Sequence, residues 1–188
     1  MSKSLKTLSD DLWKNRVEKV NSELFTLTYG SLVAQLCRDL NYNYAEVNAH
    51  LEKMGYNIGL RLVEEFFAQT NLGRCQTFRE TAEVVAKVGF RMFLNVVPQV
   101  VGVDEKQFSL VLDENPLAEF VELPDDGKAF KELWYSNVLV GVLKGALEMV
   151  QLEVNAFFVS DVLRGDDTTE LKVKLVQVLK DEIPVGED

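Results

Sequence analysis

Histidine, cysteine and proline are scarce in this chain, whose 188 residues include one histidine, two cysteines and four prolines. The histidine, His50, lies in the middle of a helical pattern without a cysteine beside it, so the sequence offers no obvious metal site and no Cys–His nucleophile. Two isolated cysteines, Cys37 and Cys75, are too few for a disulfide framework and are typical of a reducing compartment. We therefore expect a cytoplasmic protein that has neither catalytic residues nor a bound metal.

Positive charge is also in the minority, because 20 lysines and arginines stand against 30 aspartates and glutamates and leave a net charge of −10. Such a surface repels a phosphate backbone, so nucleic acid is not expected as a partner. The sequence contains neither an apolar run long enough to span a bilayer nor a glycine-rich phosphate loop, and we expect no secretory leader. What it does contain is 47% hydrophobic residues, enough for one substantial core.

Apolar residues at three- and four-residue spacing predict three helices in the first half of the chain, over residues 22–40, 44–70 and 78–95. Ser22 is the expected N-cap of the first helix. Thr77 and Glu80 form a capping box that opens the third. Residues 1–20 are a polar leader, which we expect to be mobile.

The period of the apolar residues changes in the second half of the chain. Residues 108–112 alternate and predict a strand, while residues 155–163 and 170–175 flank a Gly-Asp-Asp turn at 165–167 and predict a hairpin. Residues 133–150 are apolar on nearly every side, which indicates a buried helix. The predicted fold class is therefore α+β, in which helices are packed with a small antiparallel β-sheet in a single domain.

Four glycines lie in pairs inside two of these helices, Gly55 with Gly59 and Gly141 with Gly145. Glycine inside a helix costs about 1 kcal/mol relative to alanine, so each pair indicates a close approach of another backbone. Core packing is the favoured explanation for the second pair. For the first pair, a subunit interface and core packing are both open.

Cys75 lies in the connection between the second and third helices, where Gly73 interrupts the helical pattern. The start of a helix and the neighbouring Arg74 both favour a thiolate, so Cys75 is a candidate acylation site. The spacing alone favours a plainer interpretation, in which Cys75 is a small, partly buried apolar residue.

Several segments, read together, resemble the Bet-three family of core subunits of the TRAPP vesicle-tethering complex. The segments that carry the resemblance are residues 22–30, 54–59, 73–75, 108–110, 115–124, 134–137, 141–151 and 183–188. They run collinearly from about Asn21 to the end of the chain. The leader, with Leu12-Trp13-Lys14-Asn15, is similar to the fungal form of the family.

The resemblance implies a non-catalytic scaffold subunit that forms a helix-mediated dimer, with itself in isolation or with related TRAPP subunits in the complex. It implies a domain over residues 21–182, followed by a C-terminal arm. The expected complex captures vesicles with a COPII coat in ER-to-Golgi transport and catalyses nucleotide exchange on the Rab GTPase of that step. The expected location is peripheral, at the membranes of the cis-Golgi and the endoplasmic reticulum. With the resemblance, Gly55 and Gly59 become the candidate dimer interface.

The resemblance also assigns roles to single residues. Cys75 matches the family's acylated cysteine, whose palmitoyl chain enters an apolar tunnel in the protein, and this reverses the preference that spacing alone gives. The expected tunnel residues are Val85, Val88, Gly89 and Met92. Gly89 stands where we expect alanine in the family, so the tunnel should stay open and be wider. The arm expected to reach the GTPase consists of Ile183, Pro184, Val185, Gly186, Glu187 and Asp188.

Two alternatives remain beside the scaffold hypothesis. The same architecture is related to apolar small-molecule and haem-binding sensor domains, so the chain is alternatively a sensing domain. An acyl-transfer enzyme that uses Cys75 would need a general base, and the sequence indicates none.

Overall fold

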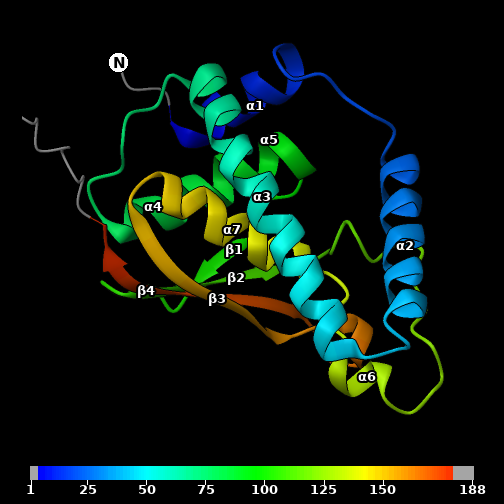
Figure 1. Cartoon of the computed structure of the whole chain (residues 1–188). Helices are drawn as coiled ribbons and strands as arrows, with labels where there is room; N and C mark the ends of the chain where they lie inside the picture. Colours follow the sequence, from blue (N-terminus) through cyan, green and yellow to red (C-terminus); the bar gives the residue numbers. More distant parts are fainter. Residues whose placement is uncertain (1–3, 180–188) are drawn as a thin grey trace, which may run out of the picture.

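The computed structural model describes residues 4–179 and contains one four-stranded antiparallel sheet in the order β1-β2-β4-β3 (Figure 1). Its strands are β1 (Gln99–Val101), β2 (Gln107–Leu112), β3 (Leu152–Ser160) and β4 (Thr169–Val178). Leu171 of β4 is the register partner of both Leu110 on β2 and Phe158 on β3. All three side chains are buried, whereas the alternate residues Asn155 and Lys174 are exposed, so one face of the sheet is core and the other meets solvent.

Helix α7 (Val138–Met149) lies over the apolar face of the sheet, beneath α3 (Figure 1). The predicted buried helix is thereby confirmed, although it begins at Val138 and not at residue 133. The preceding residues contain instead the short helix α6 (Ala129–Glu132). A single 3₁₀ turn, η2 (Val162–Arg164), connects the two strands of the hairpin.

Helix α3 (Tyr44–Thr70) crosses α7 at the two glycine pairs. A Cβ atom built on Gly55 would lie 1.9 Å from the carbonyl oxygen of Val138, and one on Gly141 would lie 1.9 Å from that of Glu52. Gly59 meets the carbonyl of Val142 in the same way, at 2.3 Å. The prediction of a subunit interface at Gly55 and Gly59 is therefore wrong. These glycines allow the two helices to cross closely inside the subunit's own core.

The predicted third helix is interrupted by a π-helical segment. It consists of α4 (Phe78–Val84), the π-helix η1 (Val85–Gly89) and α5 (Phe90–Leu94). The capping box at its start is present, because the Thr77 side chain accepts a hydrogen bond from the backbone N–H of Glu80 at 3.1 Å. The Glu80 carboxylate accepts from the backbone N–H of Gln76 at 2.6 Å.

The leader, predicted as a mobile segment over residues 1–20, contains a helix in the structure. Residues Leu5–Asn15 form helix α1, which packs against η1 and α5. Leu12 is fully buried, and so is Val88 on η1, with Met92 on α5 nearly so. None of the three belongs to the main core cluster. They form instead a small second core under α1.

Helix α2 (Ser22–Asp39) lies at the edge of the molecule (Figure 1), and in its first half Thr26 is buried while Leu24, Phe25 and Leu27 are exposed. Its N-cap is Asn21 and not the predicted Ser22, because the Asn21 side chain accepts a hydrogen bond from the N–H of Leu24 at 2.8 Å. Val33 and Cys37 in the second half are buried in the core. The first half of α2 therefore exposes several apolar side chains to solvent.

Candidate functional site

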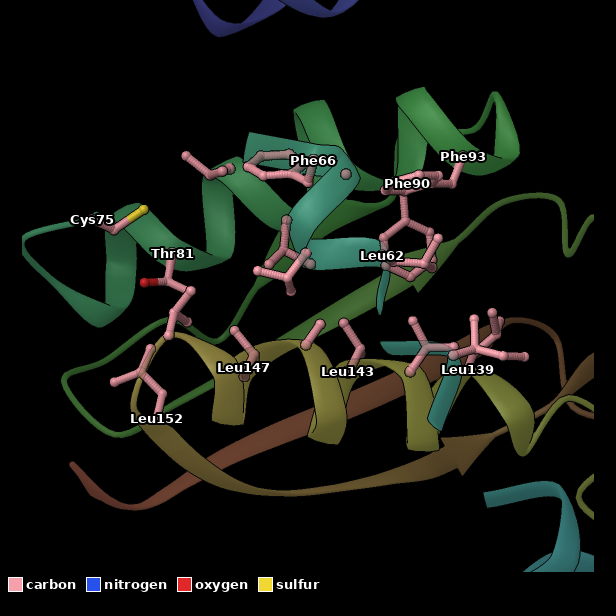
Figure 2. A pocket seen from close by; sticks show the side chains of 18 of the residues that line it. Leu62, Phe66, Cys75, Thr81, Phe90, Phe93, Leu139, Leu143, Leu147 and Leu152 are labelled. Carbon is pink, nitrogen blue, oxygen red and sulfur yellow. The ribbon is translucent and has the colours of Figure 1, made fainter. Parts of the chain in front are cut away.

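A large apolar cavity of about 940 Å³ lies between the helices. Helices α2, α3 and α7 contribute to its walls, together with the connection after α3 and the α4–η1–α5 segment. In Figure 2, Leu139, Leu143 and Leu147 form a row along α7, with Leu62 and Phe66 of α3 and Phe90 of α5 facing them across the space. The cavity is part of the hydrophobic interior, yet no described side chain fills it.

The cavity extends along the axis of α7. Its lining residues on that helix run from Val138 to Val150, just past its end. Twelve helical steps at about 1.5 Å each give a length of about 18 Å. Figure 2 shows Cys75 and Leu139 at opposite ends. The thiol therefore stands at one end of a channel that leads away from it.

Polar side chains gather at the Cys75 end of the cavity. Those that line it there are Arg74, Gln76, Thr77, Thr81, Glu105 and Gln151. The middle of the channel is lined by leucine, valine and phenylalanine. Water gains no hydrogen bonds in such a space, so the channel suits a long apolar ligand with a polar or covalently attached head at the Cys75 end.

Cys75 is half-buried, and its sulfur is turned toward the cavity (Figure 2). Burial raises the pKa of the Cys75 thiol, and the nearby Glu80 carboxylate raises it further. The Thr81 hydroxyl, a hydrogen-bond partner of the thiol, opposes them by lowering the pKa, with less effect than burial. The predicted low-pKa thiolate is therefore wrong, because burial in apolar surroundings disfavours the charged sulfur more than the helix start favours it.

Arg74 does not act on the thiol in the predicted way. Its guanidinium donates a hydrogen bond to the carbonyl oxygen of Val150 at 3.0 Å and another to the side-chain oxygen of Gln151. It thus ties the loop of Cys75 to the end of α7. Its role in the structure is to hold the rim of the cavity in place.

We expect Cys75 to react with iodoacetamide more slowly at neutral pH than an unhindered cysteine in a peptide, whose thiol has a pKa of about 8.5. The reason is its raised pKa, which leaves less thiolate at a given pH. Its rate should keep rising with pH after the peptide's rate has levelled off. Peptide mass mapping separates Cys75 from the buried Cys37. Thr81→Val should move the pH profile of Cys75 further to the alkaline side, and an unchanged profile would remove Thr81 as a partner of the thiol.

The structure places the predicted tunnel residues on two different faces. Val85 and Gly89 line the cavity, but Val88 and Met92 do not, because they point into the small core under α1. Val85 and Gly89 are four residues apart, and so are Val88 and Met92, so the segment presents one row of residues to the cavity and a neighbouring row to α1. Val84, Phe90 and Phe93 line the cavity in their place.

Gly89 leaves open space on its side of the channel. A Cβ atom built there would meet no heavy atom within 4 Å, and its backbone φ is −60°, within the helical range. A side chain at position 89 would therefore extend freely into the cavity.

Most of the wall was missed by sequence reasoning. Lining residues on α2, α3 and α7 carry the same apolar periodicity as ordinary core residues, and nothing in the sequence marks which of them border empty space. His50 does not line the cavity, and among residues 4–179 no group of three or more His, Cys, Asp or Glu side chains is arranged to hold a metal. The predicted arm, residues 183–188, lies outside the described residues.

A family model described as "Transport protein particle (TRAPP) component" matches residues 25–174 of the chain. Among curated proteins, the trafficking protein particle complex subunit BET3 of Saccharomyces cerevisiae is 59% identical over 189 residues, which cover 100% of this chain and 97% of the yeast protein. Within the part of the chain that the structure describes, no helix is both long and apolar enough to cross a membrane.

Two solved structures are similar to this one. A trafficking protein particle complex subunit 3 from Naegleria fowleri, covalently bound to palmitic acid, superposes with a TM-score of 0.81 at 44% identity, over 87% of this chain and 100% of that one. The phenol-responsive sensory domain of PoxR superposes with a TM-score of 0.62 at 13% identity, over 93% of this chain and 92% of that domain. The second likeness shows a shared fold alone.

Proposed function

Because the chain belongs to the transport protein particle (TRAPP) component family, we propose that it is a non-catalytic scaffold subunit that carries a palmitoyl or similar chain on Cys75, buried in the α7 channel. The observation that supports this most strongly is the position of Cys75, a half-buried thiol at the end of an apolar channel. At about 1.5 Å per helical residue, this channel is about 18 Å long. The palmitate on the Naegleria relative supports the same assignment.

The dimensions of the channel suit an acyl chain. An extended chain advances roughly 1.25 Å per carbon, from C–C bonds of about 1.5 Å, so about fourteen methylenes span close to 18 Å. The volume of about 940 Å³ is roughly six times that of a cavity of about 150 Å³, which holds one benzene ring. One chain therefore fits in the channel, where it passes Gly89.

Intact mass measurement tests this proposal. Protein purified from its own cells should carry an acyl mass that hydroxylamine removes, since hydroxylamine cleaves a thioester. Cys75→Ser should lack the mass, whereas Cys37→Ser should keep it, because Cys37 is buried in the core away from the channel. Wild-type protein without an acyl mass, or a mass that persists in Cys75→Ser, would refute the assignment.

We propose that the exposed stripe of α2 is the dimer surface, in place of Gly55 and Gly59. The stripe consists of Leu24, Leu27, Ser31 and Ala34, which are all exposed and follow each other at three- or four-residue spacing. In an antiparallel pair of α2 helices, Leu24 and Leu27 of one copy face the small Ala34 and Ser31 of the other. Between residues 22 and 37 the only charged side chain is Glu23, so two copies that each carry a net charge of −10 can approach here.

At the level of the complex, we propose that the subunit serves a TRAPP assembly that tethers COPII vesicles in ER-to-Golgi transport and promotes nucleotide exchange on the Rab GTPase of that step. Its location would then be peripheral, at the Golgi and the endoplasmic reticulum. The basis is family membership together with the resemblance of the chain to the Bet-three subunits.

The proposed contact with the GTPase is the arm formed by residues 183–188. Glu187 and Asp188 would compete with phosphate for Mg²⁺ and basic groups in the nucleotide pocket and so favour the empty state. We expect no exchange activity from this chain alone. A reconstituted complex that lacks residues 183–188 should assemble normally and release fluorescent GDP more slowly than the intact complex. An equal release rate would leave this subunit an architectural role only.

The sensor alternative makes a different prediction for the cavity. A haem iron in such a site would take a histidine, cysteine or tyrosine ligand, and the residues that line the cavity include Cys75 and Tyr29 but no histidine. The Tyr29 hydroxyl already donates a hydrogen bond to the carbonyl of Tyr135 at 2.6 Å. A Soret band in the purified protein would favour haem sensing over acyl binding.

A further inference from the structure

The two ends of the α7 channel differ in character. The Cys75 end has the polar rim described above. The other end reaches the surface between α2 and α3, where Phe25 is 47% exposed and Ile58 is 42% exposed, although both line the cavity. Thr28, also exposed, lies beside them on α2. Large apolar side chains that border a cavity and also meet solvent mark a second opening, here one without a charged residue.

The wall at this opening is held by few contacts. Tyr29 is anchored by its hydrogen bond to the Tyr135 carbonyl and by edge-to-face packing on the Tyr135 ring, with centroids 5.2 Å apart. Thr26 donates a hydrogen bond to the carbonyl of Pro116 at 3.2 Å. Among residues 4–179 no ion pair joins α2 to the body of the subunit. The first turns of α2 can therefore yield to a ligand without breaking a charge pair.

The opening is continuous with the α2 stripe. Leu24 and Thr28 are one helical turn apart, and Thr28 separates the stripe residues from Phe25 and Leu32 on the cavity side of the same helix. A ligand that extends out of the channel between Phe25 and Ile58 would therefore lie beside Leu24. A second copy packed on the stripe would cover it.

We infer that the α2 opening is an exit for the terminal carbons of the acyl chain, so that chain length controls how tightly this subunit binds a second copy of itself. The inference rests on the proposed acylation of Cys75 and on the proposed α2 dimer. A palmitoyl chain of about 18 Å ends at the opening, whereas a longer chain emerges from it. The carbons that emerge are exposed in the monomer and buried between Leu24 and the partner in the dimer.

The size of the effect follows from the burial of methylene groups. Each methylene removed from water strengthens association about fourfold, so two additional carbons should tighten the dimer on the order of tenfold. A chain shorter than palmitoyl ends inside the channel, so it should leave the dissociation constant of the dimer unchanged.

The test uses the full chain loaded at Cys75 from myristoyl-, palmitoyl-, stearoyl- and arachidoyl-coenzyme A, with loading measured by intact mass. Sedimentation then gives the dimer dissociation constant for each form. We expect equal values for the myristoyl and palmitoyl forms and an affinity that rises on the order of tenfold from palmitoyl to stearoyl. Leu27→Glu should prevent association for every chain, which ties the measurement to α2.

Two matched variants separate the opening from general surface effects. Ile58→Trp places a bulky ring in the opening and should abolish the dependence on chain length. The control is Val162→Trp on the turn η2, because Val162 is 39% exposed, close to the 42% of Ile58, but does not line the cavity. This variant should keep the dependence on chain length.

The outcomes distinguish the inference from the proposal on which it rests. If no acyl chain is taken up at Cys75, the proposed function fails and the inference falls with it. If stearoyl and palmitoyl forms are both loaded and dimerise equally, or if Ile58→Trp keeps the dependence on chain length, only the second opening is refuted, because the longer chain then folds within the channel.

Discussion

Gly55→Ala should destabilise the protein by more than about 3 kcal/mol, a large loss for a single methyl group. The added Cβ would lie 1.9 Å from the carbonyl oxygen of Val138 and 2.9 Å from the backbone nitrogen of Val142. Both atoms belong to helical backbone, which cannot turn aside as a flexible side chain can. The two helices would have to separate along the crossing that holds α7 against the sheet.

Gly89→Ala is the matched control for Gly55→Ala. It is the same substitution in a helical glycine, but the new methyl group meets no atom within 4 Å. Alanine is the better helix former, so this variant should be equal to wild type or more stable by about 0.5–1 kcal/mol. Urea unfolding of both variants measures the difference. If the free energy of unfolding of Gly55→Ala is within about 1 kcal/mol of the wild-type value, the helix crossing does not depend on the missing side chain.

The long helices could be predicted from sequence because their apolar faces are continuous. The predicted limits of α3, residues 44–70, agree with the structure, and the apolar surface of α7 correctly indicated a buried helix, although Glu148 and Met149 at its end are exposed. The glycine pairs were correctly assigned to close approach. Spacing alone does not say which backbone approaches, and only the structure shows that each pair is the partner of the other.

Other elements were not predicted correctly, and each error has a physical reason. Strand β1 has three residues, too few to show alternation. The segment η1–α5 is apolar both toward the channel and toward α1, and the sequence does not show which apolar residue faces which side, so Val88 and Met92 were placed in the channel. Helix α1 could have been predicted from the sequence, because Leu5, Leu8 and Leu12 follow each other at three- and four-residue spacing.

The cavity itself could not be predicted from periodicity. An apolar side chain that borders empty space and one that touches a neighbour belong to the same pattern, and the difference lies in how far apart the helices stand. Cys75 was identified as the candidate residue by its place in a connecting loop. Its raised pKa depends on the apolar walls around it, which the sequence does not display.

The acylated protein should be far more stable to heat than the protein whose thioester has been cleaved by hydroxylamine. About fourteen methylenes at roughly 0.8 kcal/mol each give an upper limit near 11 kcal/mol for the chain as part of the core. Partial collapse of the empty channel and the ordering of the chain reduce this value. If about 4 kcal/mol remains, Tm rises by roughly 8–16 °C for a domain of this size.

Gly89→Leu tests whether the gain comes from filling the channel. Its side chain starts in open space and extends into the cavity, so the variant should fold, exclude the chain and show the same Tm before and after hydroxylamine. Scanning calorimetry of the four samples, wild type and variant with and without treatment, gives the comparison. Equal Tm values for the two wild-type samples would mean that the chain lies outside the core. Normal acyl loading of Gly89→Leu would mean that the chain follows another route, because the side chain at position 89 then leaves its path open.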